Sequence, residues 1–74
     1  MKSGKELVAV EVLKTISDNP RITPLEIAKV IKTSAQYVRN TLRVLTEINL
    51  VETPVRGVYL ITVFGKEVLN RLET

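Results

Sequence analysis

The spacing of apolar residues divides the chain into helical and extended segments. A period of about 3.6 predicts a first helix over residues 4–18. Its apolar arc covers about 200° at 100° per residue and is formed by Val8, Ala9, Val10, Val12, Leu13 and Ile16. This arc is wider than a helix with one exposed side needs. The helix is expected to stop before Pro20, because proline has no amide hydrogen and disfavours helical geometry at the preceding residue.

Two further helices are predicted in quick succession. Thr23 as N-cap and Glu26 three residues later have the spacing of a capping box, and Pro24 stands at the favoured first position. That helix is expected to end near residues 32–33, and Ser34 to cap the next one. The core face of this third helix is predicted to hold Val38, Thr41, Leu42, Leu45 and Ile48. Asn49 suits the left-handed position that ends it.

After residue 49 the period changes to that of strands. Residues 50–53 and 58–61 are β-prone and flank the turn sequence PVRG, which predicts a β-hairpin. Thr62 can then cap a last helix over residues 63–72, with Phe64, Val68, Leu69 and Leu72 as its apolar residues. Residues 21–22 could add a short third strand. The fold class is therefore mainly α with a small β-hairpin, in the order helix, optional strand, helix, helix, strand, strand, helix.

Composition limits the size and location of the protein. The chain has 74 residues, of which 45% are hydrophobic, so residues 1–74 are expected to form a single small domain. Without cysteine, neither a disulfide nor a thiolate metal site can staple the core, and this favours a cytoplasmic protein. Charged residues interrupt the apolar N-terminal stretch, which is unlike a signal peptide. No segment has the length of a membrane span.

The residue types argue against catalysis. The chain has no histidine and no cysteine, so its three serines lack an imidazole base. Its three glycines are isolated and form no phosphate-binding loop, and its carboxylates lack the spacing of a calcium loop. We therefore expect neither an enzyme nor a cofactor or metal, and no small-molecule ligand is evident.

Charge placement is more informative than the net charge of +3. Residues 27–46 contain no acid, and they carry the cations Lys29, Lys32, Arg39 and Arg43. With Ala35 at zero on the helical wheel, Arg39, Arg43, Gln36 and Asn40 fall at about 40°, 80°, 100° and 140°. This stripe lies opposite the predicted core face.

The side chains of this stripe are those that read DNA. Base edges in the major groove pair with Arg at guanine and with Asn or Gln at adenine, while cations replace counterions at the phosphates. The pattern predicts a DNA recognition helix over residues 34–48. The alternative for any such stripe is a merely solvated helix face.

The sequence resembles the winged helix-turn-helix domain of MarR-like, ArsR-like and PadR-like transcription regulators. Four features over about residues 21–69 carry the resemblance: the pair Ile27-Ala28, the core spacing of Val38, Leu42 and Leu45, the run TEINLVE, and the closing motif in YLITVFGKEVL. Three positions depart from the usual pattern. Lys32 and Asn49 stand where the family often has glycine, and Thr33 replaces an apolar residue.

The resemblance implies a set of DNA contacts. Those turned toward the major groove would be Ser34, Ala35, Gln36, Arg39, Asn40 and Arg43. Arg56 at the wing tip would reach phosphate or the minor groove, although a cation there also serves solubility. Lys29 and Lys32 would meet phosphates or remain surface lysines. Tyr37 falls near 200°, at the core edge, where its ring would pack or its hydroxyl would bind phosphate.

These expectations give a function and its rival. The expected function is sequence-specific binding of double-stranded DNA by a small transcription regulator. The wide first helix predicts a homodimer through the first and last helices, near Val8, Val12 and Leu72. The rival is a winged helix that binds other proteins, which the apolar Val30 and Val44 favour; RNA binding lacks the expected aromatic pair. In a DNA binder, Arg39, Arg43 and Arg56 should share a face that is not interrupted by Glu47 and Glu52.

Overall fold

A computed structural model describes residues 4–73 and, among them, the side chains of residues 8–72. Four helices and a two-stranded hairpin follow one another as α1 (Gly4–Asp18), α2 (Pro24–Ile31), α3 (Ala35–Glu47), β1 (Val51–Glu52), β2 (Leu60–Ile61) and α4 (Val63–Glu73). The helix boundaries agree with the sequence prediction to within one or two residues. The fold is mainly α with a small hairpin, as predicted.

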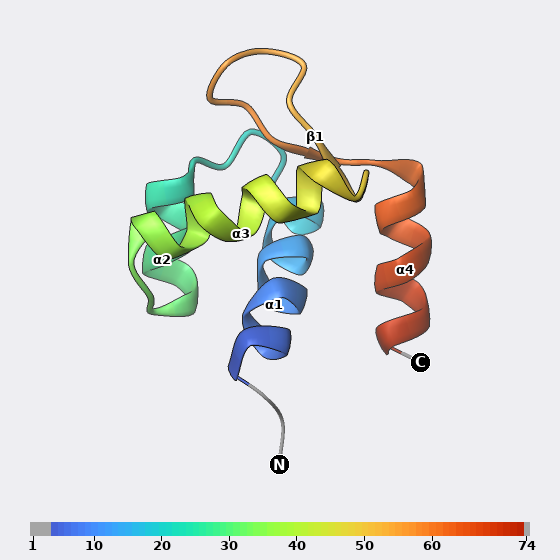
Figure 1. The fold of residues 1–74 in the computed structure, drawn as a ribbon, viewed down its shortest axis with the longest axis horizontal. Helices are drawn as coiled ribbons and strands as arrows, with labels where there is room; N and C mark the ends of the chain where they lie inside the picture. Colours follow the sequence, from blue (N-terminus) through green and yellow to red (C-terminus); the bar gives the residue numbers. More distant parts are fainter. Residues whose placement is uncertain (1–3, 74) are drawn as a thin grey trace.

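Helix α1 is the centre of the molecule. In Figure 1, α3 crosses α1, α2 lies near the start of α3, and α4 stands at the other end. Helix α1 packs against α2, α3, α4 and β2. The core between them is formed by Val12, Leu13, Ile16, Ile27, Ala28, Val38, Leu42, Leu45, Leu50, Val51 and Leu69. These apolar side chains hold α3 across α1 and leave one side of α3 uncovered.

The predicted capping box starts α2. The amide of Glu26 donates to Oγ1 of Thr23 over 3.2 Å, and the amide of Thr23 donates to Oε1 of Glu26 over 3.0 Å. Pro24 occupies the first helical position. Two amides that would otherwise lack partners are thus satisfied, and α2 begins where the sequence predicts it.

The end of α3 is a Schellman motif. Asn49 is left-handed with φ 66°, the amide of Leu50 donates to the carbonyl of Leu45 over 2.9 Å, and the amide of Asn49 donates to that of Thr46 over 3.1 Å. This confirms the predicted role of Asn49. Ile48, however, was predicted on the core face and is 52% exposed. It lies beyond the last helical residue, so the helical periodicity no longer sets its direction.

The hairpin is shorter than predicted, and the optional third strand does not form. β1 and β2 are antiparallel with Val51 opposite Ile61 and Glu52 opposite Leu60. Within residues 4–73 the sheet has these two strands. Residues 21–22 cannot join it as a regular strand, because Arg21 has φ 73° and reverses the chain after α1.

The first helix is covered more completely than its amphipathic pattern suggests. Val12 is 0% exposed and packs in the core, so the prediction that it lies at a dimer interface is wrong. The wide apolar arc is used because α2, α3 and α4 surround α1 within one chain. Among the described residues, no helix is long and apolar enough to cross a membrane.

Candidate nucleic-acid interface

A three-residue turn connects α2 to α3. Lys32 is left-handed with φ 60° and ψ 53°, and the amide of Thr33 donates to the carbonyl of Ala28 over 2.9 Å. Ser34 then caps α3, its Oγ accepting from the amide of Tyr37 over 3.1 Å. Lysine thus adopts the geometry for which glycine is the usual residue at this turn. The tight reversal places α2 directly against α3, as a helix-turn-helix requires.

The polar stripe of α3 faces away from the core. The residues Gln36, Arg39, Asn40 and Arg43 are all exposed, whereas Val38, Leu42 and Leu45 of the opposite side are buried. The side chain of Gln36 donates from Nε2 to Oδ1 of Asn40 over 3.1 Å. This bond links the two amides one helical turn apart and restrains both side chains. The side-chain nitrogen of Asn40 and the side-chain oxygen of Gln36 take no part in this bond and are available to other partners.

The remaining predicted contacts do not all lie with the stripe. Ser34, Lys29, Lys32 and Arg56 are exposed. Arg56 stands in the hairpin turn, where the amide of Val58 donates to the carbonyl of Val55 over 3.0 Å and Gly57 has φ 83°. Figure 1 shows this turn projecting beyond the helices. Ala35 packs against the core and is half-buried, so it is less exposed than these other predicted contacts.

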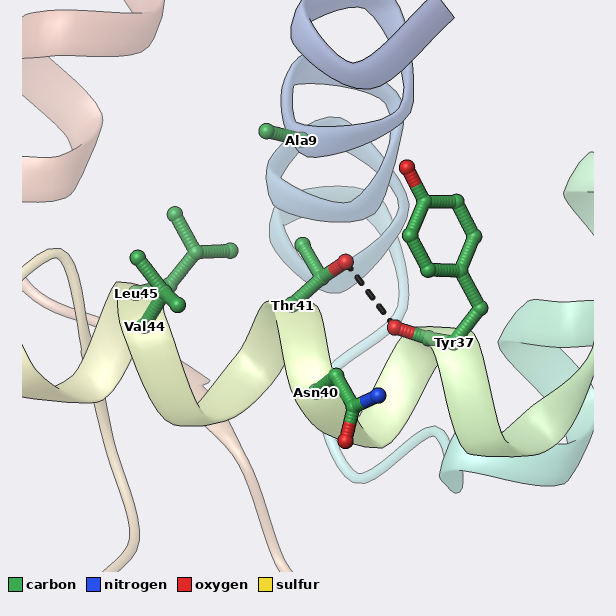
Figure 2. Close-up of a pocket in the computed structure, with 6 residues that line it drawn as sticks. All are labelled: Ala9, Tyr37, Asn40, Thr41, Val44 and Leu45. Carbon is green, nitrogen blue, oxygen red and sulfur yellow. Dashed lines mark hydrogen bonds between the residues drawn. The ribbon is translucent and has the colours of Figure 1, made fainter.

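Tyr37 also turns away from the stripe. Its ring lies beside α1 and lines a recess of about 380 Å³ between α1 and α3 (Figure 2). The other lining residues are Ala9, Asn40, Thr41, Val44 and Leu45. The hydroxyl of Thr41 donates to the carbonyl of Tyr37 over 2.9 Å. Of the two roles considered for Tyr37 from the sequence, packing is the one that this geometry supports.

A second recess, of about 400 Å³, separates α3 from the hairpin; we call it the wing groove. Its lining consists of Arg39, Arg43, Thr46, Glu47, Thr53 and Tyr59. Glu47 therefore stands beside the two arginines, and the expected uninterrupted positive face ends at this carboxylate. The alternation of strand side chains places Glu52 on the hairpin face opposite Thr53 and Tyr59.

Sequence reasoning missed Thr46, Thr53 and Tyr59 as neighbours of the arginines. Thr53 and Tyr59 come from the hairpin, and the helical wheel that found the stripe contains only residues of α3. The register found in the structure, which pairs 51 with 61 and 52 with 60, makes 53 and 59 the next opposed pair. The predicted strands over residues 50–53 and 58–61 would instead have paired 53 with 58, so the sequence carried no signal for this pair. Among the described residues, no group of His, Cys, Asp and Glu could hold a metal ion.

Comparison with known protein families identifies the family of this chain. The winged helix-turn-helix DNA-binding family matches residues 9–52, which is more than half of the chain. The chain belongs to this family. In winged-helix terms α2 and α3 are the helix-turn-helix, α3 is the recognition helix, and the β1–β2 hairpin is the wing. A search of curated protein sequences found no match.

Solved structures share this winged-helix fold. A MarR family protein of Mycobacterium tuberculosis has 24% identity and a TM-score of 0.83, covering 90% of this chain and 50% of its own. Its complex with p-aminosalicylic acid has 22% identity and a TM-score of 0.82, covering 90% and 55%. IdeR of T. acidophilum has 19% identity and a TM-score of 0.72, covering 99% and 34%. The winged-helix chain thus spans about half the length of the MarR family structures.

Proposed function

We propose that this winged-helix domain binds double-stranded DNA with sequence preference and regulates transcription from the cytoplasm, without catalytic activity. The observation that carries the proposal is the exposed stripe of α3, which begins directly after the α2–α3 turn. Four polar side chains that suit base edges share one face of a helix whose other face is buried. A helix held in this way fits the major groove of B-DNA.

Each side chain of the stripe has a distinct chemical role in this proposal. Arg39 and Arg43 offer bidentate donors for guanine, or single donors for phosphate. Gln36 and Asn40 offer amides for adenine, and their mutual hydrogen bond restrains both before DNA arrives. Prior restraint reduces the conformational entropy that binding must overcome.

Exposed residues around the stripe supply the phosphate contacts. Lys29 and Lys32 lie on α2 and at the turn, and Ser34 stands at the N-terminus of α3. Arg56 is carried by the projecting wing. Such contacts hold the protein in register on the duplex but carry no sequence information of their own.

We also propose that the protein binds DNA as a homodimer. Exposed apolar side chains on α4 support this, because Phe64 is 52% and Leu72 is 57% exposed. A symmetric dimer would present two copies of α3 to half-sites separated by about one turn of DNA.

A role in binding another protein is the second candidate. It is favoured by the exposed apolar side chains of Leu25, Val30 and Val44 on α2 and α3, and by Glu47 beside the arginines. A protein partner would cover these apolar groups, whereas a duplex would not need them. The two functions differ in their dependence on salt, since counterion release dominates binding to DNA.

Fluorescence anisotropy with a mixed-sequence duplex across a salt series tests the proposal. We expect steep weakening with salt, and a slope that falls by about one for each of Arg39→Ala and Arg43→Ala. Lys66→Ala on α4 removes the same charge from outside the proposed interface and should leave the slope unchanged. A folded protein that binds no duplex at low salt would favour the protein-binding role instead. If binding is seen, selection from a random-sequence library would then identify the preferred site.

A further inference from the structure

The wing groove has two walls of different chemistry. On α3, Arg39 and Arg43 are one helical turn apart and both line the groove. On the hairpin, Thr53 and Tyr59 are the pair that follows Val51–Ile61 and Glu52–Leu60 in the strand register, so they share one face. Two cationic side chains and two side chains that carry hydroxyl groups thus line the two walls of an open recess.

The hydroxyl groups of this groove differ in what they can donate. Thr46 already donates from Oγ1 to the carbonyl of Leu42 over 2.7 Å, which leaves it no hydrogen for a ligand. Thr53 and Tyr59 make no hydrogen bond through their hydroxyl groups to the part of the chain that the structure describes. The ring of Tyr59 is half-buried and packs against the core, which restricts its motion. A packed ring with an open hydroxyl is a donor already held in place.

The donors of the groove select for an anion. Two guanidinium groups and two hydroxyls can all donate to oxygens, while Glu47 is the only acidic side chain of the lining. An anionic oxygen can sit among the four donors, but a second negative charge would approach Glu47 and be repelled. A phosphodiester carries one negative charge and two terminal oxygens, so it suits this arrangement better than a phosphomonoester dianion.

We propose that the wing groove binds a single phosphodiester of the DNA backbone between α3 and the wing. Tyr59 and Thr53 donate through their hydroxyls, Arg39 and Arg43 supply the charge, and Glu47 sets the limit of the site. This assignment rests on the proposed function and adds two uncharged binding residues to it. Since the phosphate is held from both sides, its position fixes how deeply α3 enters the groove and along which base pairs it lies.

Replacing the hydroxyls without disturbing the fold tests this site. We expect Tyr59→Phe to weaken binding to a mixed-sequence duplex about tenfold, as for a hydrogen bond to a charged group. Thr53→Val should weaken binding in the same direction. Neither variant removes charge, so the slope against salt should remain that of the unmodified protein, unlike that of Arg39→Ala. Tyr37→Phe makes the same chemical change in the recess beside α1 and should bind as the unmodified protein does.

The outcomes separate this site from the proposed function. If the unmodified protein binds the duplex and Tyr59→Phe and Thr53→Val bind equally well, the site is wrong while DNA binding stands. If the unmodified protein binds no duplex, both proposals fail. Inorganic phosphate, titrated at constant ionic strength and followed by amide chemical shifts of the groove, distinguishes the source of the anion. Saturation by inorganic phosphate that is lost in Tyr59→Phe, together with duplex affinity that Tyr59→Phe leaves unchanged, would overturn the assignment to DNA.

Discussion

At the scale of single residues, each of the first three helices is followed by a residue whose backbone adopts the left-handed conformation. Arg21, Lys32 and Asn49 have φ of 73°, 60° and 66°. Asparagine tolerates this conformation through its short polar side chain, whereas a long side chain is strained there by about 1–2 kcal/mol. The tight path from α2 into α3 therefore depends on a strained lysine.

The strain at Lys32 predicts opposite effects for two substitutions. Lys32→Gly should be more stable than Lys32→Ala by about 1 kcal/mol, because only glycine relieves the left-handed geometry. Both variants lose the same charge, so any effect on DNA affinity should be equal in the two. Denaturant unfolding monitored by circular dichroism measures the difference. Equal stabilities would mean that the lysine is not strained in the folded protein.

A second residue-scale prediction concerns the capping box. Hydrogen bonds from the backbone amide and then the side chain of Thr23 lower the pKa of Glu26 from its ordinary value of 4.5, and Lys29 adds to the effect. The ionised carboxylate therefore stabilises the folded state above pH 4.5, and this contribution is lost as the pH falls through the lowered pKa.

Glu26→Gln tests this, because glutamine keeps the capping geometry without the charge. The stability of the variant should fall less than that of the unmodified protein as the pH is lowered, because it lacks the carboxyl that becomes protonated. Thermal unfolding between about pH 5 and pH 2 measures the difference. A pH dependence identical to that of the unmodified protein would contradict the role assigned to Glu26.

At the scale of elements, Thr62 joins three segments. Its hydroxyl donates to the carbonyl of Asn49 over 2.7 Å and accepts from the amide of Gly65 over 2.9 Å. Gly65 itself allows close packing, since a Cβ there would collide with the carbonyl oxygen of Leu50. The end of α3, the second wing strand and the start of α4 are thereby held together. The wing keeps its orientation to the recognition helix through this junction.

The junction predicts a large effect for a small change. Thr62→Val keeps the shape of the side chain but removes its hydroxyl, leaving a buried amide and a carbonyl without this partner. We expect a loss of about 2 kcal/mol in the free energy of unfolding, combining a lost N-cap with unsatisfied polar groups. Thr62→Ser, which keeps the hydroxyl, should lose much less. Chemical denaturation of the three proteins provides the comparison, and equal losses for Val and Ser would point to packing instead.

At the scale of the whole molecule, the spare apolar surface among the side chains of residues 8–72 lies on α4 more than on α1. On α1, Val12, Leu13 and Ile16 are buried in the core of their own chain. On α4, Phe64 and Leu72 are exposed. A dimer interface would therefore be centred on α4, with α1 contributing its half-buried Val8. The recognition helix and the wing would remain uncovered, which keeps DNA binding and dimerisation on separate surfaces.

Charge placed on α4 should dissociate such a dimer. Phe64→Glu and Leu72→Glu are expected to sediment as monomers at tens of micromolar, where the unmodified protein is expected to sediment as a dimer. Val55→Glu introduces the same charge at an exposed apolar residue of the wing and should leave the dimer intact. Analytical ultracentrifugation makes the comparison. A strictly monomeric unmodified protein at that concentration would remove the dimer from the proposed function.

The sequence by itself determined the four helices, the presence of a hairpin and the contents of the α3 stripe. Three of these features are local properties of the chain: the capping chemistry at Thr23 and Ser34, the tolerance of Asn49 for left-handed geometry, and the helical period. They could therefore be predicted without knowing which elements pack together. The outward position of Gln36, Arg39, Asn40 and Arg43 follows from the same period once Val38 and Leu42 are taken as core.

Only the tertiary structure decided what lies next to each face. Helical periodicity gives the direction of a side chain around the helix axis but does not say which element covers that side chain. Val12 therefore appeared available to a partner, whereas its own chain encloses it fully. Tyr37 and Ala35 lie near the border between the two faces of α3, where packing against the core, rather than period, sets their environment. The wing groove needs residues of α3 and of the hairpin, which meet because the core holds the hairpin against α3.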